Sequence, residues 1–362
     1  MENKKIKKSA LHEKAGIAPP EIVSLNSVGQ IQQFRKKQPS SKELIDGILS
    51  GNIAALSRAI TLVESTNSDH LAKANEVINA CLAHANKSVR IGITGVPGVG
   101  KSTFIEAFGK HLTRLGKKVA VLAVDPSSTI SHGSILGDKT RMEELVKDPN
   151  AYIRPSASGD TLGGVARKTR ETITLCEACG FDTILIETVG VGQSETAVHS
   201  MVDFFLLLKI SGAGDELQGI KRGIMEMADA IVINKADGDN IAKANLAKVE
   251  FNRALHLFPA KKSGWTPTTS TCSAITHDGI QEVWGTVEKF VERTKGNHYF
   301  FEKRKEQNQY WMLETINEHL KTNFYNHPEI QKLLEDNKKA VQNDEISPFV
   351  AAQLLLEKYF EK

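Results

Sequence analysis

The sequence contains little cysteine and no long apolar run, and both absences narrow the class of protein. Four cysteines in 362 residues are too few for a disulfide framework, which predicts a reducing compartment. No apolar stretch approaches the ~20 residues of a membrane span, because the run 203–210 is short and typical of a buried strand. The first residues combine lysines with Glu2 and Glu13 and lack an apolar core, so we expect no targeting signal and a cytoplasmic protein.

The chain also lacks a large net charge of either sign. The net charge of +3 gives no reason to expect nucleic acid or a membrane as a partner, and we interpret the basic run 4–8 as a solvated terminus. Cys176 and Cys179 form a C-x-x-C pair without a second pair or a histidine cluster nearby. We interpret both as residues near the end of a helix, with redox or metal chemistry as the open alternative.

A glycine-rich stretch follows the first apolar run, at Ile91–Thr103 (IGITGVPGVGKST). It matches the phosphate-binding pattern G-x-x-x-x-G-K-S at every fixed position. We expect Lys101 to reach the β- and γ-phosphates and the Ser102 hydroxyl to bind Mg²⁺. The helix that begins here directs its positive end at the anion. The predicted nucleotide contacts are Gly95, Gly98, Val99, Gly100, Lys101, Ser102 and Thr103.

Apolar runs alternate with helical patterns through the middle of the chain, as is typical of a parallel sheet with crossover helices. The fold class is therefore predicted to be α/β, a P-loop NTPase with a mostly parallel sheet flanked by helices. Ligands of such sheets lie beyond the carboxyl ends of the strands. The predicted strands are Val89–Thr94, Val119–Val124, Thr183–Glu187, Phe204–Leu208, Ala230–Ile233 and Thr268–Ser273.

Helical patterns extend this domain at both ends. We expect an N-terminal arm and helical extension over 1–86, the P-loop domain over 87–290 and a C-terminal helical extension over 291–362. The expected helices are one from Ser41 that ends at Gly51, then Ile53–Glu64, Ser68–Ala85, Arg222–Ala228, Val283–Arg293, Tyr299–Leu320, Pro328–Val341 and Pro348–Lys362.

An apolar stripe marks the C-terminal extension. It contains i, i+3 and i+4 neighbours on one helix, and its members are Tyr310, Trp311, Leu313, Ile316 and Leu320. The simpler interpretation is a stripe that faces the core. The alternative is a helical hairpin that forms a homodimer, and we expect this role for the extension.

Acidic residues follow the second strand. Asp125 is expected to hold Mg²⁺ through water or to orient the attacking water, and its alternative role is to cap the next turn. Asp138, in the polar segment 131–142, is the natural second magnesium partner. Arg154 begins a later Gly- and Ser-rich segment, where it either stabilises phosphate charge or forms a structural salt bridge.

The third predicted strand ends in ETVGVGQSE, residues 187–195. A nucleotide-sensing loop in this place is normally D-x-x-G, and here Glu187 replaces the aspartate while Gly190 keeps the glycine. Loss of the γ-phosphate would release the Gly190 N–H and the loop. Gln193 and Glu195 are both candidates for placing water. We assign catalysis to Lys101, Asp125, Glu187 and Gln193, and the metal to Ser102, Asp125, Asp138 and Glu187.

Two further clusters follow the later strands. Residues 211–221 (SGAGDELQGIK) are either a mobile segment that reports nucleotide state or an ordinary surface loop. The pattern N-K-x-D at Asn234, Lys235 and Asp237 is typical of guanine reading, because a carboxylate accepts from both N1–H and the 2-amino group. Adenine offers no such donor pair. Ser273 and Ala274 stand where a base-contacting pair is expected.

These clusters together resemble one family. The phrases GVPGVGKST, VDPSS, GSILGDKTRM, RPSASGDTLGGV, ETVGVGQSE and NKAD are similar to those of the MeaB/ArgK family, the GTPase chaperones of methylmalonyl-CoA mutase that include the methylmalonic aciduria type A protein (MMAA). The resemblance extends from the ALSRAITLVES helix to the terminal PFVAAQLLLEK, which is nearly the whole chain.

The resemblance implies a homodimeric G protein with slow intrinsic GTP hydrolysis that binds an adenosylcobalamin-dependent acyl-CoA mutase. Such proteins gate cofactor loading and protect or reactivate the mutase, while the adenosylcobalamin belongs to the partner. An additional switch that couples nucleotide state to the partner would match Asp215, Glu216, Gln218 and Lys221, with Lys221 the first residue to test.

Two other functions compete with this one. An ATP-dependent kinase or ATPase of basic amino-acid transport is disfavoured by Asn234 and Asp237, and no separate amino-acid pocket is evident. A nickel metallochaperone GTPase usually displays grouped His and Cys ligands, whereas the histidines here are dispersed.

Overall fold

The computed structural model of the chain describes residues 39–65, 67–124, 142–155, 162–188, 194–212 and 222–361. Residues Ser41–Lys362 form one compact unit. Within the described ranges, none of the helices combines the length and the apolarity that crossing a bilayer requires.

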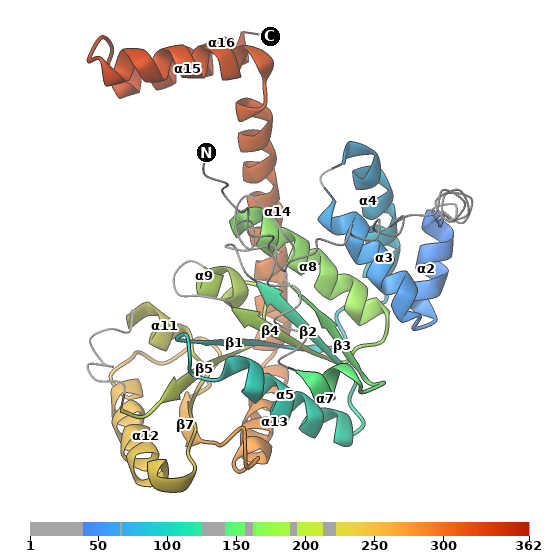
Figure 1. Ribbon diagram of the computed structural model, residues 1–362, viewed down its shortest axis with the longest axis vertical. Coiled ribbons are helices and arrows are strands. Elements are labelled where there is room, and N and C mark those ends of the chain that lie inside the picture. Colours follow the sequence, from blue (N-terminus) through green and yellow to red (C-terminus); the bar gives the residue numbers. More distant parts are fainter. Residues whose placement is uncertain are drawn as a thin grey trace, which may run out of the picture. The chain divides into compact units, whose positions relative to one another are not determined.

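A seven-stranded parallel sheet forms the centre of this unit, in the order β3-β2-β4-β1-β5-β6-β7 (Figure 1). The central strands are buried along their length, because helices cover both faces. This confirms the predicted α/β P-loop fold. The strands are β1 (Val89–Gly95), β2 (Val119–Val124), β3 (Ala151–Arg154), β4 (Thr183–Thr188), β5 (Phe204–Ile210), β6 (Ala230–Asn234) and β7 (Thr268–Thr271).

Alternate residues of each strand face different helices. In β5, Phe204, Leu206 and Leu208 pack in one core cluster, whereas Phe205 and Leu207 point to the opposite face. The first face is covered by α5 (Lys101–Arg114), α7 (Glu143–Val146) and α13 (Ile280–Gly296). The second is covered by α8 (Leu162–Ala178), α9 (Ser194–His199), α11 (Arg222–Met227) and α12 (Ile241–Leu255), with the short turn η1 (Gly238–Asn240) before α12.

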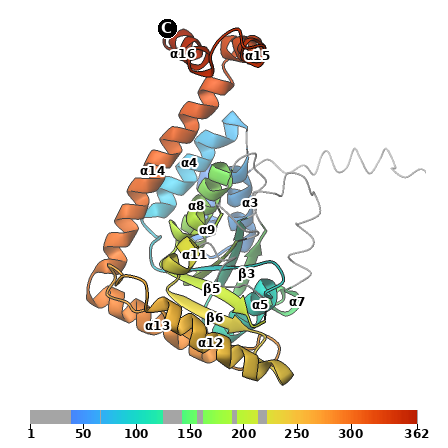
Figure 2. The same cartoon turned by 90° about the vertical axis from the view of Figure 1, so that its left-hand side faces the viewer.

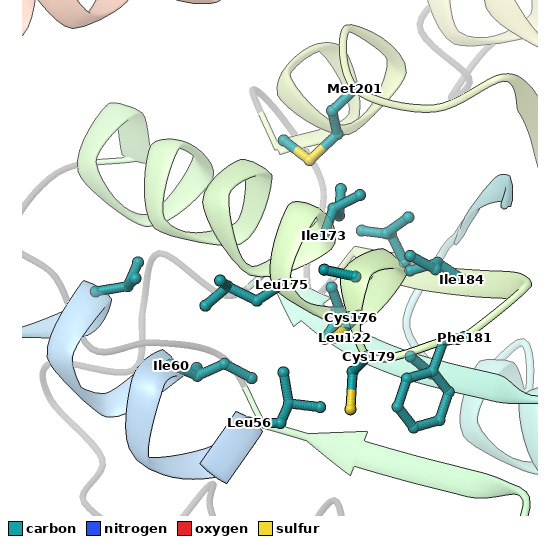
Figure 3. Close-up of a cluster of buried hydrophobic side chains, with 14 of the residues drawn as sticks. Leu56, Ile60, Leu122, Ile173, Leu175, Cys176, Cys179, Phe181, Ile184 and Met201 are labelled. Carbon is teal, nitrogen blue, oxygen red and sulfur yellow. The ribbon is translucent and has the colours of Figure 1, made fainter. Parts of the chain in front are cut away.

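Three N-terminal helices pack on the outer side of α8. They are α2 (Ser41–Leu49), α3 (Ile53–Glu64) and α4 (Ser68–Leu82), and Asn52 caps α3 by accepting from two backbone N–H groups. Leu56 and Ile60 of α3 approach Leu175 and the two cysteines of the C-x-x-C pair (Figure 3). Both thiols are free, and burial raises their pKa. Near the end of α8 they act as apolar core residues.

The long C-terminal helix α14 (Tyr299–Tyr325) runs along α8 and carries α15 (Pro328–Gln342) and α16 (Pro348–Phe360) (Figure 2). Arg304 fixes α14 to the sheet through a buried ion pair of 2.6 Å with Asp203. Of the predicted stripe, Trp311 alone is buried, while Tyr310, Leu313, Ile316 and Leu320 are 44–57% exposed. The interpretation of a core-facing stripe is therefore wrong for all but Trp311.

A strand and a helix differ from the sequence prediction for physical reasons, and α12 was not among the predicted helices. The four-residue edge strand β3 was not predicted, because a short half-buried run lacks the apolar signal of the central strands. Helix α8 begins inside the segment predicted as a Gly- and Ser-rich loop. The six predicted strands are present, with ends that shift by at most two residues. Helix α4 stops at Leu82 rather than Ala85, α13 is three residues longer at each end than predicted, and α14 runs to Tyr325 rather than Leu320.

Candidate nucleotide site

The glycine-rich loop leaves the carboxyl end of β1, where the chain passes very close to β5. A Cβ on Gly95 would lie 2.6 Å from the backbone oxygen of Leu208, which is shorter than the contacts that Cβ atoms make in proteins. Glycine at this position therefore lets β1 end beside β5 and turn into the loop. The buried side chain of Val99 holds the middle of the loop in the core.

Gly100 forms the junction between the loop and α5. Its φ of +90° is in the left-handed region, and a Cβ there would lie 2.9 Å from the Asn234 side-chain nitrogen. Helix α5 begins at the next residue, so its first turn, with Ser102 and exposed Thr103, follows the loop directly. The positive end of α5 thus adjoins the loop, as anion binding requires.

Lys101 lies at the base of this loop. Its ammonium donates to the backbone oxygen of Gly95 at 2.8 Å. Burial lowers the pKa of Lys101, and the nearby carboxylates of Glu187 and Glu195 oppose this shift. Glu195 is fully buried on α9, which places a carboxylate close to the loop lysine. Of the two candidates for placing water, Glu195 is the one that the structure describes.

Oxygen groups gather where β4 ends beside β1. The Ser102 hydroxyl donates to Glu187 Oε1 at 3.4 Å, and Glu187 is buried. A hydroxyl and a carboxylate are the oxygen ligands that Mg²⁺ prefers. The adjacent Thr188 hydroxyl donates to that of Thr94 at 2.9 Å and ties the end of β4 to β1. Sequence reasoning missed this pair, because a threonine at a strand end carries no motif.

The N-K-x-D segment is joined to the phosphate loop. Asn234 donates to the Val99 backbone oxygen at 2.9 Å, and its own oxygen accepts from the Ala274 N–H at 3.3 Å. Lys235, in a left-handed conformation, donates to the Gly98 oxygen at 2.9 Å. Two loops from distant parts of the sequence therefore form one surface.

Asp237 is held by the loop after β7. Its Oδ2 accepts from the Ser273 hydroxyl at 2.5 Å, and the Ser273 oxygen in turn accepts from the N–H groups of Ile275 and Thr276. This arrangement fixes one oxygen of the half-buried Asp237 carboxylate. A carboxylate oriented in this way can accept from a pair of N–H donors on a base.

Arg154 has the structural role that the sequence left open. At the end of β3 its guanidinium forms an ion pair with Glu64 of α3, with Nε donating to Oε1 at 3.1 Å. The pair links the sheet edge to the N-terminal helices, and nothing in its geometry directs Arg154 to the phosphate loop.

Several predicted residues lie outside the described ranges. They are Asp125, Asp138, Gly190, Gln193, Asp215, Glu216, Gln218 and Lys221. In the part of the chain that is described, no group of three or more His, Cys, Asp or Glu side chains is placed to hold a metal ion. Of the predicted metal ligands, the structure thus brings together Ser102 and Glu187.

An all-parallel sheet with a glycine-rich loop between β1 and α5, and with N-K-x-D at the end of β6, defines a P-loop nucleotide-binding protein. The chain belongs to the family described as methylmalonyl Co-A mutase-associated GTPase MeaB, whose family model matches residues 56–329. It is therefore a GTPase, which confirms the enzymatic class and the family resemblance.

Known proteins are similar to this chain in sequence along most of its length, and one solved structure is also similar in fold. The mouse (Mus musculus) protein named methylmalonic aciduria type A homolog, mitochondrial, is 46% identical over 90% of this chain and 80% of its own length. GTPase ArgK of Escherichia coli strain K12 is 43% identical over 87% of this chain and 95% of its own. A crystal structure titled LAO/AO transport system kinase superposes with a TM-score of 0.71 at 37% identity, covering 88% of this chain and 97% of that one.

The geometry predicts that Gly100→Ala weakens GTP binding by about tenfold or more, because a left-handed alanine costs about 1–2 kcal/mol and its Cβ displaces Asn234. Isothermal titration calorimetry measures the affinity. The matched control is Gly116→Ala, a position with φ +81° and no neighbour within 4 Å of the added Cβ. The control should lose similar stability but keep its GTP affinity, and an equal loss of affinity in both variants would contradict the prediction.

Proposed function

We propose that this GTPase is a chaperone of an adenosylcobalamin-dependent acyl-CoA mutase. It gates the loading of adenosylcobalamin and protects or reactivates the mutase, with GTP hydrolysis as the timing step. The family match over residues 56–329 carries this proposal, because the family is described by its association with methylmalonyl-CoA mutase. The mouse relative is named for methylmalonic aciduria, a name that fits the same client chemistry.

In this proposal the phosphate-binding site keeps the same structure in the GTP and GDP states. Lys101 and the amino end of α5 bind the β- and γ-phosphates. Ser102 and Glu187 hold Mg²⁺ together with Asp125 and Asp138 from the adjoining segments. The bound ion supplies positive charge to the phosphate oxygens. The observed oxygen pair of Ser102 and Glu187, 3.4 Å apart at the loop, supports this assignment.

The changing part consists of the segments that follow β4 and β5. The hydroxyl pair of Thr188 and Thr94 ties the end of β4 to β1, so β4 itself is a fixed element in this scheme. Gly190 and Gln193 follow β4 in the sequence, and the switch assigned to them would respond to the γ-phosphate. The segment with Asp215, Glu216, Gln218 and Lys221 carries the nucleotide state to the mutase.

Asp237 reads guanine in this scheme, and Asp237→Asn should reverse the preference. The asparagine amide would face the guanine donors with an N–H, and GTP affinity should fall on the order of 10³-fold. Xanthine has a carbonyl at C2 in place of the amino group, so affinity for XTP should rise. Competition binding with GTP, XTP and ATP measures both changes.

Two outcomes would contradict guanine reading. One is an unchanged base preference in Asp237→Asn. The other is equal hydrolysis of ATP and GTP by the wild type, which would favour the ATP-dependent transport kinase instead. The control Asp239→Asn changes an exposed carboxylate two residues away and should leave base preference unaltered.

The partner is tested by affinity capture from the native host, with the full chain loaded either with GDP or with a non-hydrolysable GTP analogue. A cobalamin-dependent acyl-CoA mutase should be recovered in at least one of the two states and should stimulate GTP hydrolysis. Recovery of no such mutase in both states would contradict the client assignment.

Lys221→Ala should separate partner coupling from nucleotide binding. We expect mutase-stimulated hydrolysis to fall by about tenfold or more, as a lost coupling contact would cause, with GTP affinity unchanged. Steady-state hydrolysis with and without mutase measures this. Full stimulation in Lys221→Ala would exclude the residue from the coupling switch.

The C-terminal helices fit a homodimer. Exposed apolar side chains continue from α14 onto α16, where Phe349 and Phe360 are 86% and 73% exposed. An apolar groove of about 480 Å³ lies between the end of α14, α15 and α16. These exposed apolar side chains and the groove form a continuous apolar surface rather than scattered single residues, and such a surface is typical of a protein–protein interface.

A double substitution, Leu313→Glu with Ile316→Glu, should weaken this dimer by about 30-fold or more, because it places two carboxylates in a dry interface. Both side chains are about half exposed in the single chain, so folding should be little affected. Sedimentation equilibrium measures the association. Leu246→Glu on α12, where the leucine is 63% exposed, is the control. A wild type that stays monomeric at tens of micromolar would contradict the homodimer.

A further inference from the structure

A cavity of about 790 Å³ opens at the edge of the sheet opposite the phosphate loop. Its walls come from α9, α11, the end of α12 with the segment that follows it to β7, Phe290 of α13 and the first turns of α14. Asp229, immediately before β6, lies at its base. The cavity is thus separate from the nucleotide site, which gathers at the carboxyl ends of the strands.

One side of the cavity is aromatic. Trp265 and Phe290 lie edge to face with ring centroids 5.5 Å apart, and Phe258 also lines the space. The Trp265 indole N–H donates to the Asp229 backbone oxygen at 2.9 Å, which fixes the ring. This wall suits a flat apolar group.

Lys303 lines the other side with an ammonium that has hydrogen-bonding capacity to spare. Its Nζ donates to the Asp203 backbone oxygen at 2.9 Å and forms no ion pair with any described residue. An ammonium has three N–H donors. Burial lowers the pKa of Lys303, while the carboxylates of Asp229 and Asp203 oppose the shift. An anion beside Lys303 would relieve that cost of burial.

The other buried charges here are already satisfied. Asp229 accepts from Lys261 at Oδ1 and from the Phe205 N–H at Oδ2. Lys261 also donates to the backbone oxygens of Met227 and Ala228, so its three N–H groups are used. The remaining charged residues of the lining, Glu226 and Lys262, are exposed. Lys303 is therefore the cation that an anion would meet inside the cavity.

Two neutral donors stand near it. Burial lowers the pKa of His199 to about 4, so the ring is uncharged at pH 7 and carries one N–H. Burial raises the pKa of Tyr299, which keeps its hydroxyl protonated. Both residues line the cavity. A neutral donor stabilises an anion without repelling Lys303.

We propose that this cavity binds a small organic anion, a carboxylate or a phosphate monoester that carries an apolar or aromatic group. The anionic group lies at Lys303 with His199 and Tyr299 as further donors. The apolar group packs against Trp265 and Phe258. Carboxylate and phosphate present the same charged oxygens to an ammonium, and the experiment separates them.

The position of the cavity links it to the nucleotide. Helices α9 and α11 each begin directly after a segment expected to change with nucleotide state, residues 189–193 and 213–221, and their last residues line the cavity. This link rests on the proposed function. An anion that contacts His199 at the end of α9 should therefore bind differently in the GDP and GTP states, and by reciprocity should alter nucleotide affinity.

Calorimetric titration of the full chain tests the site, with phenylacetate and phenyl phosphate as probes and inorganic phosphate and 2-phenylethanol as comparisons. Saturating GDP or a non-hydrolysable GTP analogue keeps the phosphate loop filled. We expect one of the two aromatic anions to bind more tightly than either comparison. Lys303→Met should weaken that binding by about tenfold or more, and Lys303→Arg should retain most of it. Lys305→Met, two residues away with its side chain 69% exposed, is the control.

A labelling experiment needs no variant. Acetic anhydride modifies lysine amines, and mass spectrometry of the wild type should show Lys303, but not Lys305, protected by the bound anion. Binding of 2-phenylethanol as tight as that of the anions, or no protection of Lys303, would overturn the anion site. Equal anion affinity with GDP and with the GTP analogue would overturn only the link between the cavity and the nucleotide, and the anion site would stand. None of these results bears on whether the chain captures a mutase.

Discussion

Two buried ion pairs at the amino edge of the sheet hold the outer helices to the central strand. Arg90 of β1 pairs with Glu177 of α8 at 2.8 Å, and Arg304 of α14 pairs with Asp203 at 2.6 Å. Asp203 also accepts from the backbone N–H of Arg90, so the two pairs share β1. Removing one partner of such a pair typically costs about 3–5 kcal/mol, because a charge is left buried and alone. Because these pairs stabilise the amino ends of the strands, the loops at the carboxyl ends are available to bind the nucleotide.

Much of the fold could be predicted because the central strands are buried on both faces. Their continuous apolar runs separate them clearly from the amphipathic helices. The prediction failed where burial is partial. Strand β3 is a half-buried edge strand, and α8 starts at glycines that resemble a loop. For α14, helical periodicity identified an apolar face correctly, but periodicity does not say whether the core or another surface covers that face.

The phosphate loop could be predicted because its geometry is local, set by the backbone freedom of a few glycines next to a strand and a helix. Contacts across the sheet could not. No spacing rule connects Asn234 to the Val99 oxygen or Thr188 to Thr94, although both contacts hold the site together. Arg154 shows the same limit: its type fits a phosphate, and its partner Glu64 on a distant helix decides otherwise.

The length of α14 has a mechanical consequence. Its 27 residues extend about 40 Å at 1.5 Å per residue, and contacts hold it to about its midpoint: Arg304 pairs with Asp203, and the buried Trp311 donates its indole N–H to the Ser200 backbone oxygen at 3.2 Å. The part beyond Trp311 extends about 20 Å further and acts as a lever arm. A tilt of about 5° at Trp311 would move the far end of this arm by about 2 Å, a displacement comparable to that of helices at subunit interfaces in allosteric proteins. Small rearrangements at the amino edge of the sheet would thus reach α15 and α16 amplified, without any change inside the helix itself.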